Sequence, residues 1–158
     1  MHQKKVRNIG IILIIVGLLT ILIANLFNYF VYPEKNEVCF KENCFEVELA
    51  TTPKEQAIGL SNRSSLDPNK GMLFIFGKEG DYPFWMKGML FPLDMIWISS
   101  NSTVVDIGRS MDTCIICFGI YPEANATYVL ELNANTTQRI NLNVGDKLDL
   151  RIPRRYLS

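Results

Sequence analysis

The sequence predicts a mainly β fold, α+β in detail, in which a small β-sandwich or open barrel with one short helix follows a single transmembrane helix. Apolar and polar residues alternate over several short segments after residue 44, as they do in strands with one buried face. The segment 8–33 carries no charged side chain. The expected parts are a basic tail at 1–8, a transmembrane signal-anchor helix at 9–32, a linker with the first hairpin at 33–43, and a β-rich domain at 44–158.

The N-terminal apolar segment is predicted to be a membrane anchor. Three basic residues precede it, and 9–30 would measure about 33 Å as a helix, enough to cross a hydrocarbon core of about 30 Å. A cleaved signal peptide is one alternative, but its apolar stretch is shorter and ends in small residues, whereas this one ends in Asn-Leu-Phe-Asn-Tyr-Phe. A buried core helix is the other alternative.

The charges around this segment predict its orientation. Because the basic residues precede the span, the positive-inside rule places the N-terminus in the cytoplasm and residues 34–158 outside the cell, as a single-pass protein of the cell membrane. This outer part has 16 acidic and 13 basic residues, a net charge of −3, and the whole chain has a net charge of zero. A nucleic-acid-binding protein carries a basic surplus, so no nucleic-acid partner is expected.

The four cysteines form two close pairs, Cys39 with Cys44 and Cys114 with Cys117. Outside the cell four cysteines predict disulfides with three possible connectivities, of which the local pairing is the first choice, since the first pair could face each other across a short hairpin. Free or redox-active thiols at Cys114 and Cys117 are an alternative, although the Phe-Gly-Ile-Tyr-Pro that follows them does not start a helix. A four-cysteine zinc site is a further alternative, for which the first pair has the wrong spacing. No metal and no cofactor are expected, and His2 is the only histidine.

Six strands and one helix are predicted in the outer part. The helix is expected after Thr52, where Pro53 occupies the first helical position and Glu55 completes a capping box. The strands are expected at 45–49, 72–76, 94–98, 103–107, 127–132 and 148–152, separated by turns at 77–81, 99–102 and 144–146.

Four Asn-X-Ser/Thr sequons also suit an extracellular surface. The candidate glycosylation sites are Asn62, Asn101, Asn125 and Asn135. The alternative is that asparagine, serine and threonine simply gather in turns.

Three runs in the middle of the chain form a distinctive pattern, namely Gly71-Met-Leu-Phe, Phe84-Trp-Met-Lys and Pro92-Leu-Asp. They are preceded by Gly59-Leu and Arg63, and followed by Tyr128-Val-Leu-Glu-Leu and Gly145-Asp. Because these motifs occur in the order typical of that family, the chain from about 44 to 152 resembles the prokaryotic domain of unknown function 192. The resemblance implies a small β-sandwich with a short helix, often exported, and no established biochemical activity. The chain departs from the family at Gly88-Met89, where the family usually has Asn-Thr, and near Asn135, where it usually has glycine.

Four residues of this pattern are candidates for ligand binding: Arg63, Trp85, Lys87 and Asp94. Trp85 would provide an apolar floor, and the polar side chains would converge on a sugar or a small anionic ligand. In the structural alternative, which is the simpler interpretation of these residues, Trp85 packs in the core or at its rim, Asp94 pairs with Lys87 or with backbone groups, and Arg63 pairs with Asp94 or Asp67.

The leading functional prediction is a non-enzymatic binding module that is held at the membrane by its N-terminal helix. Its partner would be a small ligand, a glycan or an envelope protein. One alternative is a hydrolase or transferase that uses Asp94 with Lys87 or Glu131. The other is a disulfide redox protein that uses Cys114 and Cys117.

Overall fold

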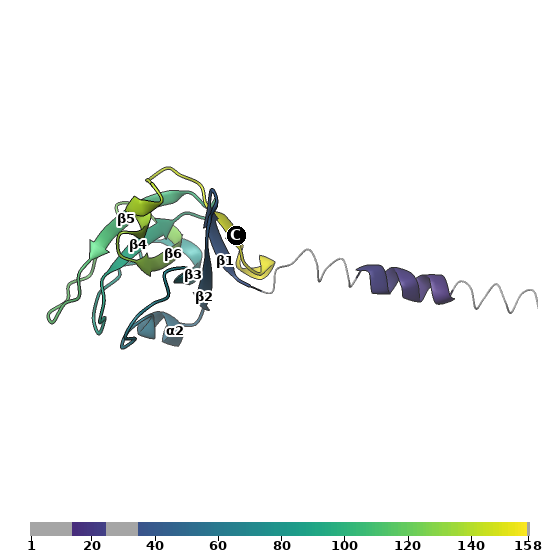
Figure 1. Ribbon diagram of the computed structural model, residues 1–158, viewed down its shortest axis with the longest axis horizontal. Helices are drawn as coiled ribbons and strands as arrows, with labels where there is room; N and C mark the ends of the chain where they lie inside the picture. The colour runs from purple at the N-terminus through teal and green to yellow at the C-terminus, as the bar shows by residue number, and fades with distance from the viewer. Residues whose placement is uncertain (1–13, 25–34, 158) are drawn as a thin grey trace, which may run out of the picture. The chain divides into compact units, whose positions relative to one another are not determined.

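The structure, a computed structural model, describes residues 14–24 and 35–157 (Figure 1). The chain divides into two units, Met1–Glu34 and Lys35–Ser158. In the first unit, residues 14–24 form a helix with exposed side chains. Within the described residues, no helix has both the length and the apolarity needed to cross a bilayer. The expected tail at 1–8 and both ends of the expected span at 9–32 lie outside the described residues.

The second unit is built on a single sheet of seven strands in the order β5-β4-β6-β3-β2-β1-β7. The strands are β1 (Glu37–Phe40), β2 (Asn43–Ala50), β3 (Lys70–Gly80), β4 (Leu93–Ile98), β5 (Val104–Met111), β6 (Ala126–Asn133) and β7 (Asp149–Arg151). Only the β2–β3 pair is parallel, and α2 (Pro53–Ile58) lies in the connection between these two strands. The six expected strands all occur, and β1 forms the expected first hairpin with β2.

The sheet curls into a half-barrel, so the fold is closer to the expected open barrel than to a sandwich of two sheets (Figure 1). Its two edges approach each other where the segment before β7 hydrogen-bonds to the start of β5. The amide of Val104 donates to the carbonyl of Asp146 at 2.8 Å, and the amide of Leu148 donates to the carbonyl of Ser102 at 2.9 Å. Val104 of one edge strand and Leu150 of the other therefore share one buried apolar cluster, which fills the inside of the curl.

A second apolar cluster covers the outer face of the sheet. Because side chains alternate along a strand, Ile96 and Ile98 point into the inner cluster, whereas Met95 and Trp97 belong to the outer one. The residues that pack over this outer face from outside the sheet include Leu60, which follows α2, and Phe84, Met86 and Met89 of the segment 81–92.

The start of α2 confirms the predicted capping box. The hydroxyl of Thr52 accepts a hydrogen bond from the amide of Glu55 at 3.3 Å, and the Glu55 carboxylate accepts one from the amide of Thr52 at 2.9 Å. Two further short elements were not predicted, the helix α3 (Thr136–Arg139) and a 3₁₀ turn at Arg154–Tyr156. Each is a single turn, too short for a helical pattern to show in the sequence.

Both predicted disulfides are present. Cys39 and Cys44 are directly opposite each other on β1 and β2, and their bond closes the first hairpin. Cys114 and Cys117 are bonded within the loop between β5 and β6. In this state the four cysteines offer no thiolate for the zinc site that the sequence left open.

Candidate functional site

A cavity of about 260 Å³ lies against the outer face of the sheet, between α2 and the segment 83–89. Its walls are mostly apolar. The residues that line it are Pro53, Gln56, Ala57, Ile58, Gly59, Leu60, Ser61, Phe74, Phe76, Pro83, Phe84, Trp85, Met89 and Glu131. A concave, largely apolar cavity with few polar groups is typical of small-molecule sites.

Aromatic side chains from two parts of the chain form much of the wall. Phe74 of β3 and Phe84 of the following loop meet edge to face, with their ring centroids 4.8 Å apart. Phe84 is held in place because its backbone exchanges two hydrogen bonds with Ile120. Trp85 also lines the cavity, but half of its surface (50%) is exposed. Trp85 is therefore a wall residue in contact with solvent and is not buried in the core, whereas its neighbours Phe84 and Met86 are buried.

Gly59 occupies the turn that ends α2 and also borders the cavity. Its φ of +51° lies in the left-handed region, which side chains other than that of glycine rarely adopt. A Cβ atom at this position would come within 3.3 Å of the Phe74 ring and 4.0 Å of Glu131 Oε2. A side chain at 59 would thus crowd the Phe74 ring and lie against the Glu131 carboxyl.

Glu131 is the only titratable residue among those that line the cavity. It lies on β6 between Met72 of β3 and Met95 of β4, and its exposed fraction is 4%. Its Oε2 atom is buried and has no hydrogen-bond partner. Burial without a partner disfavours the charged form of a carboxyl, and it raises the pKa of Glu131 to about 8. The side chain is therefore mostly a neutral carboxylic acid at pH 7.

The nearest cation is already paired. Arg63 forms a two-point ion pair with Glu48, with contacts of 2.5 and 2.8 Å, and not with Asp94 or Asp67 as the structural alternative expected. This pair lowers the pKa of Glu48 and raises that of Arg63. Glu48, Met72, Glu131 and Met95 form one row across β2, β3, β6 and β4. The charge of Arg63 also lowers the pKa of Glu131, but burial is the larger effect.

Asp94 lies on the opposite face of the sheet and does not line the cavity. It pairs with Leu132, one residue along β6 from Glu131, and adjacent residues of a strand point to opposite faces. Its carboxylate is fully buried and accepts hydrogen bonds from the amides of Ser110, Asn135 and Thr137 and from the Thr137 hydroxyl, at 2.7–3.2 Å. Asp94 thus ties β4 to β5 and to α3.

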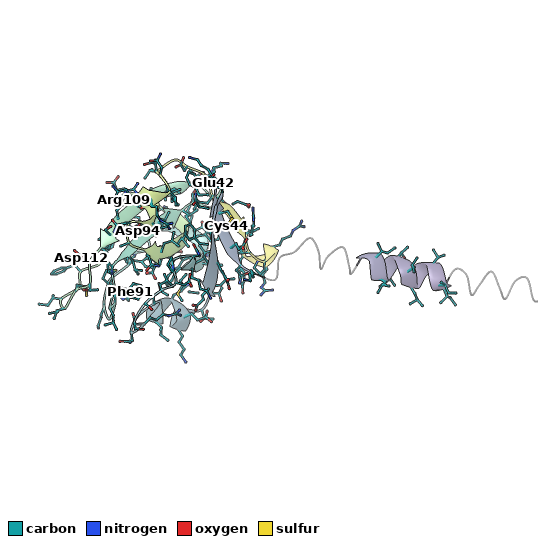
Figure 2. All side chains as sticks on the ribbon, viewed as in Figure 1. Glu42, Cys44, Phe91, Asp94, Arg109 and Asp112 are labelled. Carbon is teal, nitrogen blue, oxygen red and sulfur yellow. A yellow bond between two sulfur atoms is a disulfide. The ribbon has the colours of Figure 1, made fainter. Side chains whose placement is uncertain are left out.

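Arg109 extends this network and was not predicted from the sequence. Its guanidinium donates to the Thr137 hydroxyl at 2.7 Å and to the carbonyl of Leu142 at 2.8 Å. Asp94 and Arg109, both labelled in Figure 2, share the Thr137 hydroxyl as a hydrogen-bond partner. The contacts of both residues are with other groups of the protein, which indicates a structural role for both.

The four candidate ligand-binding residues therefore do not converge. Trp85 lines the cavity, and Asp94 faces away from it. Arg63 does not line the cavity, but its charge lowers the pKa of Glu131. Lys87 is exposed, and its backbone carbonyl accepts a hydrogen bond from the Ser61 hydroxyl at 3.1 Å. Sequence reasoning assigned Glu131 only to a catalytic alternative, although one signal marked it, since it is the only charged residue in the apolar run 126–132.

The four candidate glycosylation sites are exposed asparagines. Two of them also accept hydrogen bonds, Asn101 within its own turn and Asn135 from a residue on β5. The side-chain oxygen of Asn101 accepts hydrogen bonds from the Ser99 hydroxyl and the Thr103 amide, and that of Asn135 accepts one from the Ser110 hydroxyl. Their glycosylation stays a prediction.

Comparison with solved structures supports the fold. The chain is similar to a candidate transcription regulator from Sinorhizobium meliloti 1021, with 32% identity and a TM-score of 0.67 over 75% of this chain and 95% of that one. It is also similar to a protein of unknown function from Novosphingobium aromaticivorans DSM 12444, with 28% identity and a TM-score of 0.67 over 73% of this chain and 83% of that one. Among proteins with curated descriptions, none matches the sequence.

The family comparison agrees with the motifs around Gly71, Phe84 and Pro92. The model of the family DUF192, described as uncharacterised ACR, matches residues 36–150, which include all seven strands except the last residue of β7. The chain therefore belongs to the DUF192 family.

Proposed function

We propose that the protein is a membrane-anchored extracellular module that binds a small, mostly apolar ligand in the cavity beside Glu131. The observation that carries this proposal is a carboxyl group that is 4% exposed, lines an apolar cavity and has an unpartnered oxygen. Leaving a buried polar atom without a partner costs free energy, so a ligand that satisfies it gains affinity from that contact.

The size and polarity of the cavity narrow the class of ligand. A cavity of about 150 Å³ can hold benzene, so a cavity of 260 Å³ suits a molecule of about ten non-hydrogen atoms. A sugar ring carries several hydroxyl groups, and the walls offer few polar partners for them. Of the partners that the sequence left open, the cavity therefore favours a small apolar ligand over a glycan.

Binding is better supported than catalysis. A hydrolase that works with two carboxyl groups needs both of them in one site, flanking the bond that is cleaved. Asp94 and Glu131 lie on opposite faces of the sheet, and Lys87 is not among the residues that line the cavity. The residues of the redox alternative, Cys114 and Cys117, form a disulfide in the loop between β5 and β6, and neither lines this cavity.

The anchoring part of the proposal is supported by the sequence. The basic residues before position 8 and the uncharged segment 8–33 are typical of an anchor with its N-terminus in the cytoplasm. One relative is described as a candidate transcription regulator. This chain has no basic surplus, so we do not extend nucleic-acid binding to it.

The binding proposal is tested with isopropylbenzene and acetophenone, two probes of nine non-hydrogen atoms. The full chain is placed in lipid nanodiscs, and the probes are titrated while the indole N–H signal of Trp85 is followed by NMR. We expect a saturable shift in wild type. Ala57→Phe, on the cavity side of α2, should abolish the shift, whereas Lys54→Phe on the same helix but outside the cavity should retain it. The same saturable shift in Ala57→Phe as in wild type would place the binding elsewhere and contradict the proposal.

A further inference from the structure

We infer that the cavity selects a neutral ligand, an apolar body with one carbonyl or hydroxyl oxygen that accepts the proton of the Glu131 carboxyl. This inference rests on the proposed function and deepens it, because it assigns the chemistry of the contact at Glu131.

The surroundings of Glu131 give an ionised carboxylate nothing to pair with. Its cross-strand neighbours Met72 and Met95 are buried and have no N–H or O–H group in their side chains. Gln56, the lining residue with a side-chain amide, directs its Nε2 atom to the carbonyls of Ile75 and Ala50, at 2.8 and 3.4 Å. A buried carboxyl in such surroundings keeps its proton, which it can then donate to a ligand.

The charges around this face do not change that conclusion. Arg63 is the one cation whose charge acts on Glu131, and its guanidinium is bound at two points by Glu48. On α2, the carboxylate of Glu55 accepts hydrogen bonds from the amides of Thr51 and Thr52 at the start of the helix. On β4, Asp94 points to the other face.

Other ligand charges fit this site less well. An ammonium group would require the ionised form of Glu131, which is a minor form at pH 7 because burial raises its pKa to about 8. An anionic ligand would need a free cation, and Arg63 is already paired. A neutral acceptor uses the carboxyl in the form that the empty cavity already holds.

The two modes of binding predict opposite pH dependence. The protonated fraction of Glu131 is nearly constant below pH 7 and falls about tenfold per unit well above pH 8. The affinity for a neutral acceptor should follow this fraction. The affinity for a cation should instead rise with pH and level off above pH 8, since only the ionised fraction is competent to bind.

The test uses three probes with the same number and connectivity of non-hydrogen atoms: acetophenone, which is neutral and accepts a hydrogen bond; isopropylbenzene, which has no polar group; and 1-phenylethylammonium, which is cationic. The dissociation constants of acetophenone and isopropylbenzene are measured between pH 6 and 10 on the full chain in nanodiscs, from the Trp85 indole signal. That of 1-phenylethylammonium is measured over the part of this range in which its own amine stays protonated. We expect acetophenone to bind about tenfold more tightly than isopropylbenzene at pH 6–7, which corresponds to one hydrogen bond, and to lose this preference above pH 8.

Two variants isolate the proton of Glu131. Glu131→Met removes the donor at similar volume, so acetophenone and isopropylbenzene should bind equally. Glu131→Gln keeps an N–H donor but does not titrate, so the preference for acetophenone should persist and become independent of pH.

The outcomes separate the inference from the proposed function. Equal binding of acetophenone and isopropylbenzene to wild type would overturn the inference and leave the binding cavity standing. Tighter binding of 1-phenylethylammonium with rising pH would also overturn it, because Glu131 would then act as an anion. Binding of none of the three probes would overturn the proposed function and the inference with it.

Discussion

Two carboxyl groups, Asp94 and Glu131, are buried on opposite faces of the same sheet, and their surroundings give them opposite properties. Asp94 accepts four hydrogen bonds from three residues. Glu131 has an unpartnered oxygen and a pKa that burial raises to about 8. Residue type therefore does not determine the role of either group, because one carboxylate organises the fold whereas the other is a neutral acid beside a cavity.

The raised pKa of Glu131 makes stability depend on pH. Between pH 4.5 and 8 the folded protein keeps the Glu131 proton while the unfolded chain releases it, so stability falls as pH rises through this window. Relative to Glu131→Gln, which cannot titrate, wild type should lose roughly 3 kcal/mol between pH 4.5 and 7. Denaturant unfolding of both proteins across this range measures the difference. A difference that does not change with pH would contradict the burial argument.

The two tryptophans should respond very differently to truncation. Trp97 is fully buried, and its indole N–H donates to the carbonyl of Tyr82 at 3.0 Å, whereas Trp85 is half-exposed. Trp97→Ala should therefore destabilise the domain by about 3–5 kcal/mol, and Trp85→Ala by about 1 kcal/mol or less. Thermal melts of the two variants compare them directly. Unfolding caused by Trp85→Ala would contradict this prediction and show that Trp85 packs as a core residue.

At the scale of elements, short pieces of chain are held by side chains that lie far away in the sequence. The helix α3 has only four residues, and its Thr137 contacts Asp94 of β4 and Arg109 of β5. Neither helix propensity nor apolar periodicity can predict such an element, because tertiary hydrogen bonds stabilise it. By contrast, α2 was predicted at its start, since Thr52 and Glu55 carry a local capping signal.

Removal of the Asp94 carboxylate should therefore affect α3 most. Asp94→Ala leaves the buried amide of Thr137 without its acceptor, together with those of Ser110 and Asn135, and should cost at least about 3 kcal/mol of stability. The exposed Asp112 offers a matched control, because Asp112→Ala should change stability by less than about 0.5 kcal/mol. Amide hydrogen exchange should show the largest loss of protection at 135–137. Unchanged protection there would contradict the role assigned to Asp94.

The strands were predictable from alternation, but the arrangement of the sheet was not. Phe45, Val47 and Leu49 mark β2 in the sequence, yet its parallel partner β3 is reached only through α2. The curl of the sheet depends on backbone hydrogen bonds that Ser102 and Val104 form with Leu148 and Asp146, more than 40 positions away in the sequence. The cavity combines α2, β3, β6 and the segment 83–89, so a single sequence motif could reveal only part of it.

At the scale of the whole molecule, the proposal places the ligand-binding domain outside the cell and its N-terminal tail inside. Protease added to intact cells should then degrade residues 34–158 and spare the tail. An epitope placed at each end, followed by immunoblotting, measures this. The lysed sample, in which both ends are cleaved, is the control. Protection of residues 34–158 in cells whose envelope admits the protease would contradict the proposed orientation.

The central claim is that Glu131 is a neutral acid facing a ligand cavity, and its titration tests this most directly. The pKa of Glu131 can be measured from the ¹³C shift of its carboxyl carbon, assigned with Glu131→Gln, in the free protein and with saturating acetophenone. We predict a value near 8 in the free protein and a higher value with acetophenone, because a neutral acceptor binds the protonated form. A value near 4.5 that does not respond to the ligand would contradict the account.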